Sequence, residues 1–315
     1  MTQYQRADLS RVKTISIATR KSKVTSRAFA RPFPARGDSF RAFVNGLPDI
    51  LLARDLRILV DSLVSARRKK KQVILMMGAH VVKVGLSPVL VDLLRRGLIT
   101  AVAMNSAAAI HDVETALWGK TSEDVAANLS DGRFGMARET GEFIHGTVKK
   151  AFEKGGVGLG TAVGERLLEE GAPFAHLSIL ATAARCGVPV TVHVALGTDI
   201  IHMHPAMDGG AMGALSHHDF RLFSRLVSTL EGGVFINLGS AVILPEVFLK
   251  AVSVVRNLGF SLAGITTVNM DFQRHYRPQV NIVERPTAGS GRGISLIGHH
   301  EIMFPLLMAA VIEKL

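Results

Sequence analysis

The chain alternates short apolar runs with longer stretches in which apolar residues recur every three or four positions. Such runs, bounded by glycine or polar residues, are typical of strands buried on both faces of a parallel sheet. The predicted strands are residues 72–77, 99–104, 188–194, 234–238 and 265–270, with a shorter one at 280–283.

Helical spacing fills the intervals between these runs. It is clearest in residues 49–63, 87–96 and 133–154. An alternation of strand, helix and strand gives βαβ units, whose strands are parallel and whose crossovers are right-handed. The pattern therefore predicts an α/β fold with a mostly parallel sheet.

Small or polar residues follow several predicted strands. In an open α/β sheet, ligands bind just beyond the carboxyl ends of the strands, and small residues there let the backbone turn tightly or a ligand approach closely. The positions expected to contact a cofactor at this edge are Gly78, Ala79, His80, Asn105, Ser106, Gly239 and Ser240.

The stretch after the strand at 99–104 combines small residues with titratable ones. The small residues at 106–109 predict a tight passage, followed by a helix whose first turn carries His111, Asp112 and Glu114. Asp112 could accept hydrogen bonds from ribose hydroxyls or hold an amine, and His111 could transfer a proton. The alternative is that Asp112 caps a helix and favours its dipole.

A long polar segment, residues 197–210, follows the strand at 188–194. Long irregular segments at strand ends usually serve a function. His202 and His204 are two residues apart and would point the same way in an extended segment. With Asp199 they could form a metal site, or they could hydrogen-bond neighbouring backbone. Because no third and fourth ligand is evident, we assign no metal ligands.

Two further glycine-rich segments and one basic run have competing interpretations. Residues 155–164 are similar to a dinucleotide fingerprint, but that motif follows a strand and here a helix precedes it, which favours an interhelical turn. Residues 287–293 form either an anion cradle with Arg292 or a hairpin turn between strands at 280–283 and 294–297. The basic run Arg67–Lys71 is interpreted as a solvated helix end that favours the dipole.

Composition narrows the class of protein. The 315 residues are 48% hydrophobic and 20% charged, as in globular chains with a core. No apolar run approaches the roughly 20 residues of a membrane span, and no secretory signal is visible. The single cysteine excludes a disulfide within the chain and suits a reducing compartment. We therefore expect a cytoplasmic protein without a membrane partner.

The net charge of +11 is concentrated near the N-terminus, since residues 1–41 hold ten basic and two acidic side chains, a net +8. We predict a basic arm at residues 1–44 and one α/β domain at 45–315. The arm could bind nucleic acid, act as a transit peptide, or wrap a neighbouring subunit or anionic ligand. It lacks interleaved aromatic residues and any nucleic-acid module, so we favour subunit wrapping and expect no nucleic acid.

Five segments, taken in order, resemble the deoxyhypusine synthase family, in particular its bacterial deoxyhypusine synthase-like members. These segments are residues 78–80, 104–112, 188–199, 239–242 and 303–307. The resemblance covers residues 45–315 and implies a Rossmann-like, doubly wound sheet with helices on both faces. It also implies a homotetramer with NAD bound near the strand ends at a subunit interface.

The resemblance assigns roles to two carboxylates and to the arm. Asp112 falls where the family has a carboxylate that holds the cofactor ribose, and Asp199 falls at a cofactor-facing Asp. The basic arm corresponds to an N-terminal extension that packs over an active-site entrance.

One departure changes the expected activity. Members of the family form an imine on a lysine near the C-terminus, in a Trp-Gly-Lys context. Here residues 280–286 stand in that region, and no lysine lies between Lys250 and Lys314. Without that amine the imine cannot form there, so the chain is not predicted to be a true deoxyhypusine synthase.

We predict an NAD-binding enzyme that acts on an amine or another small substrate by redox-assisted transfer. His111, His202 and His204 are the candidates for proton transfer. The alternatives are a metal-dependent hydrolase that uses Asp199, His202 and His204, and a non-catalytic nucleotide-binding assembly that keeps the fold.

Overall fold

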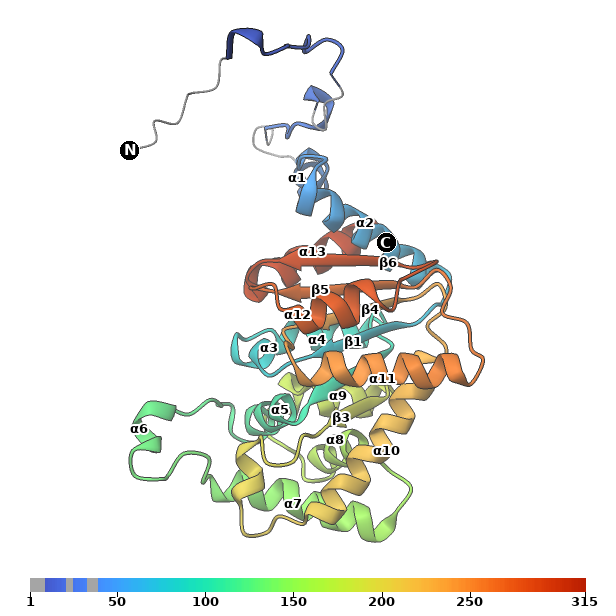
Figure 1. Cartoon of the computed structure of the whole chain (residues 1–315). Helices are drawn as coiled ribbons and strands as arrows, with labels where there is room; N and C mark the ends of the chain where they lie inside the picture. Colours follow the sequence, from blue (N-terminus) through green and yellow to red (C-terminus); the bar gives the residue numbers. More distant parts are fainter. Residues whose placement is uncertain (1–8, 21–24, 33–38) are drawn as a thin grey trace, which may run out of the picture.

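The centre of the molecule is a six-stranded sheet in which every neighbouring pair of strands is parallel (Figure 1). The computed structural model describes residues 9–20, 25–32 and 39–315. The strands are β1 (Val73–Met77), β2 (Ala101–Asn105), β3 (Val190–His193), β4 (Val234–Leu238), β5 (Thr266–Asp271) and β6 (Arg292–Ile297). Their order, β3-β2-β1-β4-β5-β6, reverses direction between β1 and β4. This is the Rossmann order, and it confirms the predicted fold class.

Helices cover both faces of the sheet (Figure 1). The longer ones are α1 (Phe40–Gly46), α2 (Leu51–Arg68), α4 (Ser87–Arg95), α5 (Ser106–Trp118), α7 (Arg138–Lys154), α8 (Leu159–Glu169), α9 (Ile179–Cys186), α10 (Gly209–Val227), α11 (Ile243–Asn257) and α13 (His300–Lys314). Short turns of helix are η1 (Leu9–Arg11), η2 (Ser26–Ala28), α3 (His80–Lys83), α6 (Val125–Leu129), η3 (Ala175–Leu177), η4 (Ile200–Met203), α12 (Tyr276–Pro278) and η5 (Gln279–Glu284). Among the described residues, no helix combines the length and the hydropathy that a membrane crossing requires.

The side chains of β1 divide the core into two halves. Val73, Leu75 and Met77 belong to the hydrophobic cluster that includes α2, α4, α9 and α13. Ile74 and Met76 belong to the cluster on the other face, which includes α10, α11 and η5. Because side chains alternate across a strand, an apolar run without polar interruption is what a central strand covered on both faces requires.

The strands predicted from apolar runs are confirmed, except the one at 280–283. Those residues lie in the π-helical turn η5. Since β6 runs parallel to β5, the chain must cross back to the other end of the sheet between them, so no hairpin is possible there. The buried η5 makes this crossing, and the Thr267 hydroxyl donates to the carbonyl of Ile282 (2.5 Å).

Two helices begin earlier than predicted. Helix α5 starts at Ser106, because the Asn105 side chain accepts the N–H of Ala108 (3.0 Å) and caps it. The small residues at 106–109 are therefore its first turn and not a passage before it. Similarly, α10 starts at Gly209, inside the segment 197–210 that was expected to be irregular, because Asp208 caps its first turn.

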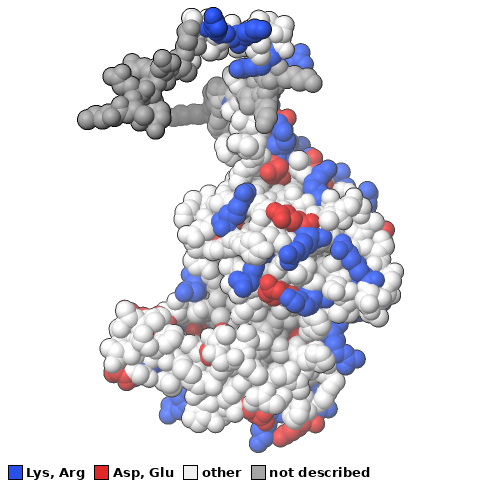
Figure 2. All heavy atoms as spheres, viewed as in Figure 1, with Lys and Arg blue, Asp and Glu red and all other residues white. Residues whose placement is uncertain are grey.

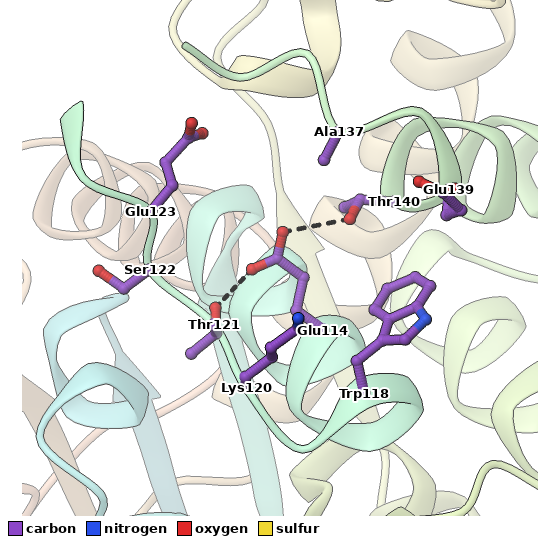
Figure 3. Close-up of a pocket in the computed structure, with 9 residues that line it drawn as sticks. All are labelled: Glu114, Trp118, Lys120, Thr121, Ser122, Glu123, Ala137, Glu139 and Thr140. Carbon is purple, nitrogen blue, oxygen red and sulfur yellow. Dashed lines mark hydrogen bonds between the residues drawn. The ribbon is translucent and has the colours of Figure 1, made fainter. Parts of the chain in front are cut away.

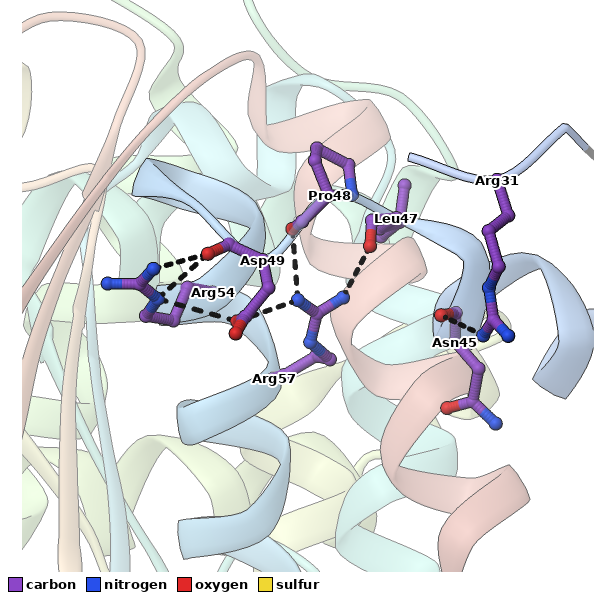
Figure 4. A network of polar contacts seen from close by, with 7 residues as sticks. All are labelled: Arg31, Asn45, Leu47, Pro48, Asp49, Arg54 and Arg57. Carbon is purple, nitrogen blue, oxygen red and sulfur yellow. Dashed lines mark hydrogen bonds and ion pairs between the residues drawn. The ribbon is translucent and has the colours of Figure 1, made fainter. Parts of the chain in front are cut away.

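The end of the arm is held against the body by guanidinium groups (Figure 4). Arg31 donates to the carbonyl of Asn45 (2.9 Å). Arg57, on α2, donates to the carbonyls of residues 47 and 48 and to the carboxylate of Asp49 (3.0 Å). Arg57 thereby lowers the pKa of Asp49. The predicted domain boundary at residue 44 falls inside α1, and the division into arm and domain stays a prediction.

A buried carboxylate joins the helices beneath β3. Asp219, on α10, accepts the N–H groups of Gly160 (2.9 Å), at the start of α8, and of Val192 (2.8 Å), in β3. A Cβ at Gly158 would lie only 1.7 Å from Asp219 Oδ1. The glycine-rich segment is thus the interhelical turn that its sequence context predicts. In nucleotide-binding loops the N–H groups at such a helix start bind a phosphate. Here the carboxylate of Asp219 occupies that place.

Burial raises the pKa of Asp219 to about 7, although its backbone hydrogen bonds lower it. The folded protein therefore holds this proton more tightly than the unfolded chain, and the stabilisation is lost as pH rises from about 4 through about 7. We predict that, relative to Asp219→Asn, the wild-type free energy of unfolding falls by roughly 4 kcal/mol between pH 4 and pH 8. Denaturant titrations at both pH values measure it.

The exposed Asp131 provides the matched control for this comparison. Asp131→Asn should keep the wild-type pH dependence. An identical pH dependence in wild type and Asp219→Asn would contradict the assignment.

Candidate functional site

Backbone packing closes the switch point between β1 and β4. The N–H of Gly78 donates to the carbonyl of Leu238 (2.9 Å), and a Cβ at Gly78 would lie 2.1 Å from the carbonyl oxygen of Gly239. Gly239 has a φ of +66°, and a Cβ there would lie 2.8 Å from the ring of His300. Ser240 is buried beside it. In this structure these glycines serve the close approach of two turns to each other.

Aromatic rings cover the same place. His80 is exposed, and its ring centroid lies 5.8 Å from that of Phe272 and 5.5 Å from that of His300. Burial lowers the pKa of His300, although Asp271, 3.9 Å away, raises it. Of the residues expected to hold a cofactor here, Ala79 is half-buried, and only His80 presents an exposed side chain.

The next pair of strand ends is more open. Asn105 ends β2 and caps α5, and the hydroxyl of Ser106 donates to the carboxylate of Asp199, which lies after β3. This bond joins two segments that are far apart in the sequence at the carboxyl ends of neighbouring strands. Asp199 is half-buried and lines a cavity, as a group that contacts a ligand must.

Asp112 has a different place from the one that the resemblance implies. Its side chain is fully buried and accepts the hydroxyl of Ser178 (2.6 Å) and the N–H groups of Ile179 (2.7 Å) and Leu180 (3.0 Å). Burial raises its pKa to about 6, against the effect of these hydrogen bonds. A carboxylate so committed holds the start of α9 and has no atom free for a ribose. The capping alternative therefore describes Asp112, although the helix it caps is α9 and not its own.

His111 and Glu114, both on α5, belong to one hydrogen-bond network, of which Figure 3 shows the bonds from Thr121 and Thr140 to Glu114. Glu114 accepts the hydroxyls of Thr121 and Thr140, the latter at 3.1 Å. The Thr121 oxygen lies 2.6 Å from His111 Nδ1. Since the Thr121 proton points at Glu114, Nδ1 is the donor, and neutral His111 keeps Nε2 as its acceptor. Burial alone would raise the pKa of Glu114, but these hydrogen bonds together lower it.

Two cavities meet at Glu114. The inner cavity has a volume of about 300 Å³ and lies between α3, α5 and the segment after β3, where Lys83, Ala107, His111, Thr198 and Asp199 line it. The outer cavity has a volume of about 480 Å³, and Trp118, Lys120, Thr121, Glu139 and Thr140 line it (Figure 3). Both are lined by Glu114, Ser122, Glu123 and Ala137. We call this pair of cavities the carboxyl-edge site.

His202 and His204 do not line the carboxyl-edge site. The Nδ1 of His202 accepts the N–H groups of Gly197 (3.0 Å) and Asp199 (3.1 Å), and so stabilises its own turn. His204 stacks on His145, with ring centroids 5.6 Å apart. Because η4 is a tight 3₁₀ turn and not an extended segment, the two histidines have separate partners. The backbone-bonding alternative is therefore the one observed.

A metal centre finds no support in this segment. Within residues 9–20, 25–32 and 39–315, no three His, Cys, Asp or Glu side chains are grouped so that they could hold a metal ion. The hydrolase alternative built on Asp199, His202 and His204 therefore loses its basis.

Several residues of the carboxyl-edge site were not predicted from the sequence. Lys83 is the last residue of the short helix α3, and Glu123 and Thr121 lie in the loop between α5 and α6. Thr140 and Glu139 come from the start of α7. Trp118 gave the one available signal in the sequence, since it is the single tryptophan of the chain. In the structure it is exposed at the end of α5.

Comparison with known proteins supports the fold. Residues 57–177 match the family described as "Arginine dihydrolase ArgZ-like, C-terminal, Rossmann fold". This stretch is less than half of the chain. No curated protein matches.

Solved structures with a similar fold share little sequence with the chain. The apo form of ArgZ, an arginine dihydrolase of the ornithine–ammonia cycle in cyanobacteria, has a TM-score of 0.51 and 16% identity over 85% of this chain. A putative LOR/SDH protein from Methanococcus maripaludis S2 has a TM-score of 0.51 and 14% identity, over 91% of this chain and 74% of its own. A putative deoxyhypusine synthase from Entamoeba histolytica has a TM-score of 0.51 and 14% identity, over 88% and 94%.

These likenesses concern architecture. The chain spans about a third (34%) of the length of ArgZ. At identities of 14–16% they show the fold and not the activity. The fold of this chain is Rossmann-like and resembles that of a deoxyhypusine synthase, as the five sequence segments implied.

The Glu114 network makes a prediction about charge. Thr140→Val removes one donor to a half-buried carboxylate and should raise the pKa of Glu114, because its ionised form then loses a hydrogen bond. A titration followed by NMR of the carboxyl carbon measures this shift. Thr229→Val is the control, since that hydroxyl donates to the backbone of α10. An unchanged pKa in Thr140→Val would show that Thr140 does not stabilise the carboxylate.

Proposed function

We propose that the chain is a Rossmann-type enzyme that binds NAD in the inner cavity and a small amine in the outer cavity. The observation that carries the proposal is that two cavities meet at Glu114, whose pKa is lowered. Lys83 and the first turn of α5 line only the inner cavity, and Trp118 lines only the outer one. Residues that follow the carboxyl ends of β2 and β3 line the inner cavity, at the edge of the sheet where ligands of this fold bind, and the outer cavity adjoins it.

The inner cavity offers groups that suit a nucleotide. Lys83 supplies a positive charge, and Ala107 belongs to the first turn of α5, where the helix dipole favours a phosphate. Asp199 supplies a carboxylate for ribose hydroxyls, oriented by its bond to Ser106. These three features fit NAD, although the βα turn at residues 78–80 is closed by packing. Asp199 and Ser106 thus keep their proposed role, whereas Asp112 positions helices.

The outer cavity suits a cation. Glu114, Glu123 and Glu139 line it with three carboxylates, against the single ammonium of Lys120. Trp118 adds an aromatic face that attracts alkylammonium groups. Because hydrogen bonds lower the pKa of Glu114, its negative charge is present at neutral pH. We therefore propose a primary or secondary amine as the substrate class.

His111 lies where the two cavities adjoin and is the proposed proton acceptor. Its Nδ1 is fixed by Thr121, which leaves Nε2 to take a proton from a bound ammonium group. When bound, NAD would supply a hydride acceptor, the chemistry that side chains lack. His202 and His204 are no longer proposed for this step, because both accept backbone N–H groups and His204 stacks on His145, away from the two cavities.

The homotetramer implied by the resemblance remains part of the proposal. Apolar side chains of the arm, including Leu9, Ile15 and Ile17, are at least 74% exposed in the single chain. An interface between subunits would bury them. The non-catalytic alternative shares the same fold and differs only in showing no turnover with any amine.

A ligand titration of Trp118 emission tests the proposal, since this tryptophan lines the outer cavity and is the single one in the chain. We predict that NADH and a small diamine each change this emission. Lys83→Gln should weaken NADH binding about tenfold, and Glu114→Gln should weaken diamine binding about tenfold, because each loses a charge-assisted contact.

Two exposed positions of helix α7 provide matched controls for both charge changes. Lys150→Gln and Glu153→Gln should bind both ligands as the wild type does. The proposal is contradicted if neither ligand changes the emission, or if Lys83→Gln and Glu114→Gln behave like these controls.

A further inference from the structure

A third cavity lies at the opposite, amino edge of the sheet and has no part in the proposed function. Its floor is formed by Val234, Thr266 and Arg292, the first residues of β4, β5 and β6, which are register partners of one another. Its volume is about 520 Å³. We call it the amino-edge cavity.

Two sequence segments that the proposed function does not use meet in this cavity. Lys69 comes from the basic run Arg67–Lys71 at the end of α2, and Ser290, Gly291 and Arg292 come from the glycine-rich segment before β6. They are more than 200 residues apart in the sequence. The anion-cradle interpretation of residues 287–293 therefore gains a second cation from across the cavity, and the hairpin interpretation is excluded by the parallel sheet.

The charged side chains around the amino-edge cavity are mostly cations without an acidic partner among the described residues. Neither Lys69 nor Arg292 forms an ion pair with an acidic side chain of the described ranges, and both are exposed. The Cε of Lys71 would lie 3.6 Å from a Cβ at Gly232, another lining residue, so a third cation stands at the rim. Asp61 also lines the cavity, but its carboxylate pairs with the ammonium of Lys314.

Figure 2 shows the wider setting of these charges. Lys and Arg side chains are frequent on the half of the body that contains α2, β6 and the C-terminus, whereas the front of the opposite half is largely uncharged. Cations at the end of α2 also favour its dipole, so their presence alone does not require a ligand. Arg292 lies on a different element, β6, and lines the same cavity as Lys69. The dipole of α2 does not explain its position there.

We infer that the amino-edge cavity binds the phosphate group of a small molecule. A guanidinium presents paired donors that match phosphate oxygens, an ammonium adds a point charge, and the hydroxyls of Ser65 and Ser290 are further donors from the two walls. The cavity lies at the end of the strands opposite to the carboxyl-edge site. It is therefore a second, separate anion site, independent of the proposed enzyme activity.

Calorimetric titration of the full chain with inorganic phosphate, against chloride at equal ionic strength, tests this inference. Lys69→Gln and Arg292→Gln should each weaken phosphate binding at least about tenfold. Lys150→Gln, on α7, should bind phosphate as the wild type does. Unchanged unfolding midpoints without phosphate would show that the exposed substitutions leave the fold intact.

A further variant separates the two anion sites. Lys83→Gln changes the inner cavity and should leave phosphate binding at the amino edge unchanged. Glycerol phosphate is titrated in parallel to distinguish two possible ligands. If the natural ligand is an organic phosphate ester, glycerol phosphate should bind more tightly than inorganic phosphate. If it is the free phosphate ion, the two should bind equally well. The inference is overturned if phosphate binds no better than chloride, if Lys69→Gln and Arg292→Gln bind like the wild type, or if Lys83→Gln alone loses binding.

Discussion

The buried carboxylate of Asp112 is the interaction on which the geometry of the carboxyl-edge site depends. It joins the middle of α5 to the first turn of α9 through one hydroxyl and two backbone N–H groups. If α5 rotated, those buried groups would lose their partner, at a cost of about 1–3 kcal/mol each. Burial of the charge has its own cost, which appears as a pKa raised to about 6.

The fixed position of α5 determines where its other polar side chains lie. His111 and Glu114 are placed at the two cavities and bonded to Thr121 and Thr140, which come from other segments. Asp219 has a similar role at β3, because it accepts the N–H groups of Val192 and of Gly160 at the start of α8. Asp112 suggests a catalytic role by its sequence context, and Asp219 suggests one by its raised pKa. Both carboxylates instead hold helices in place around the side chains that line the cavities.

Much of the fold could be predicted from the sequence, because central strands of a parallel sheet are marked by unbroken apolar runs. Residues 280–283 were misread as a strand because a buried helical turn and a buried strand share that composition. The start of α5 was misplaced because its cap, Asn105, is also the last residue of β2.

The site was harder to predict than the fold. Asp112 could be a ligand or a cap by sequence, and only its contacts decide between these. Other residues complete the cavities, such as Lys83 at the end of the short helix α3 and Glu123 in a loop, and no local pattern encodes how these segments pack. The spacing of His202 and His204 predicts that they point the same way only if the segment is extended. Because the segment is a tight 3₁₀ turn, the prediction does not apply.

The two edges of the sheet present different chemistry. At the carboxyl edge, Glu114 and Glu123 line both cavities, Lys83 and the first turn of α5 line the inner one, and Trp118 lines the outer one. At the amino edge, Lys69 and Arg292 face a polar cavity with little opposing charge. The fold resembles that of the Entamoeba histolytica structure described above. Residues 251–313 contain no lysine, so no side chain of that stretch can form an imine with a substrate.

The most direct test of the central claim is a crystal structure of the full chain after soaking with NAD. The account predicts ordered cofactor between α3, the first turn of α5 and Asp199, with its phosphates near Lys83 and its nicotinamide toward Glu114. Cofactor bound instead over Gly78 and Gly239, or no cofactor at a saturating concentration, would contradict it.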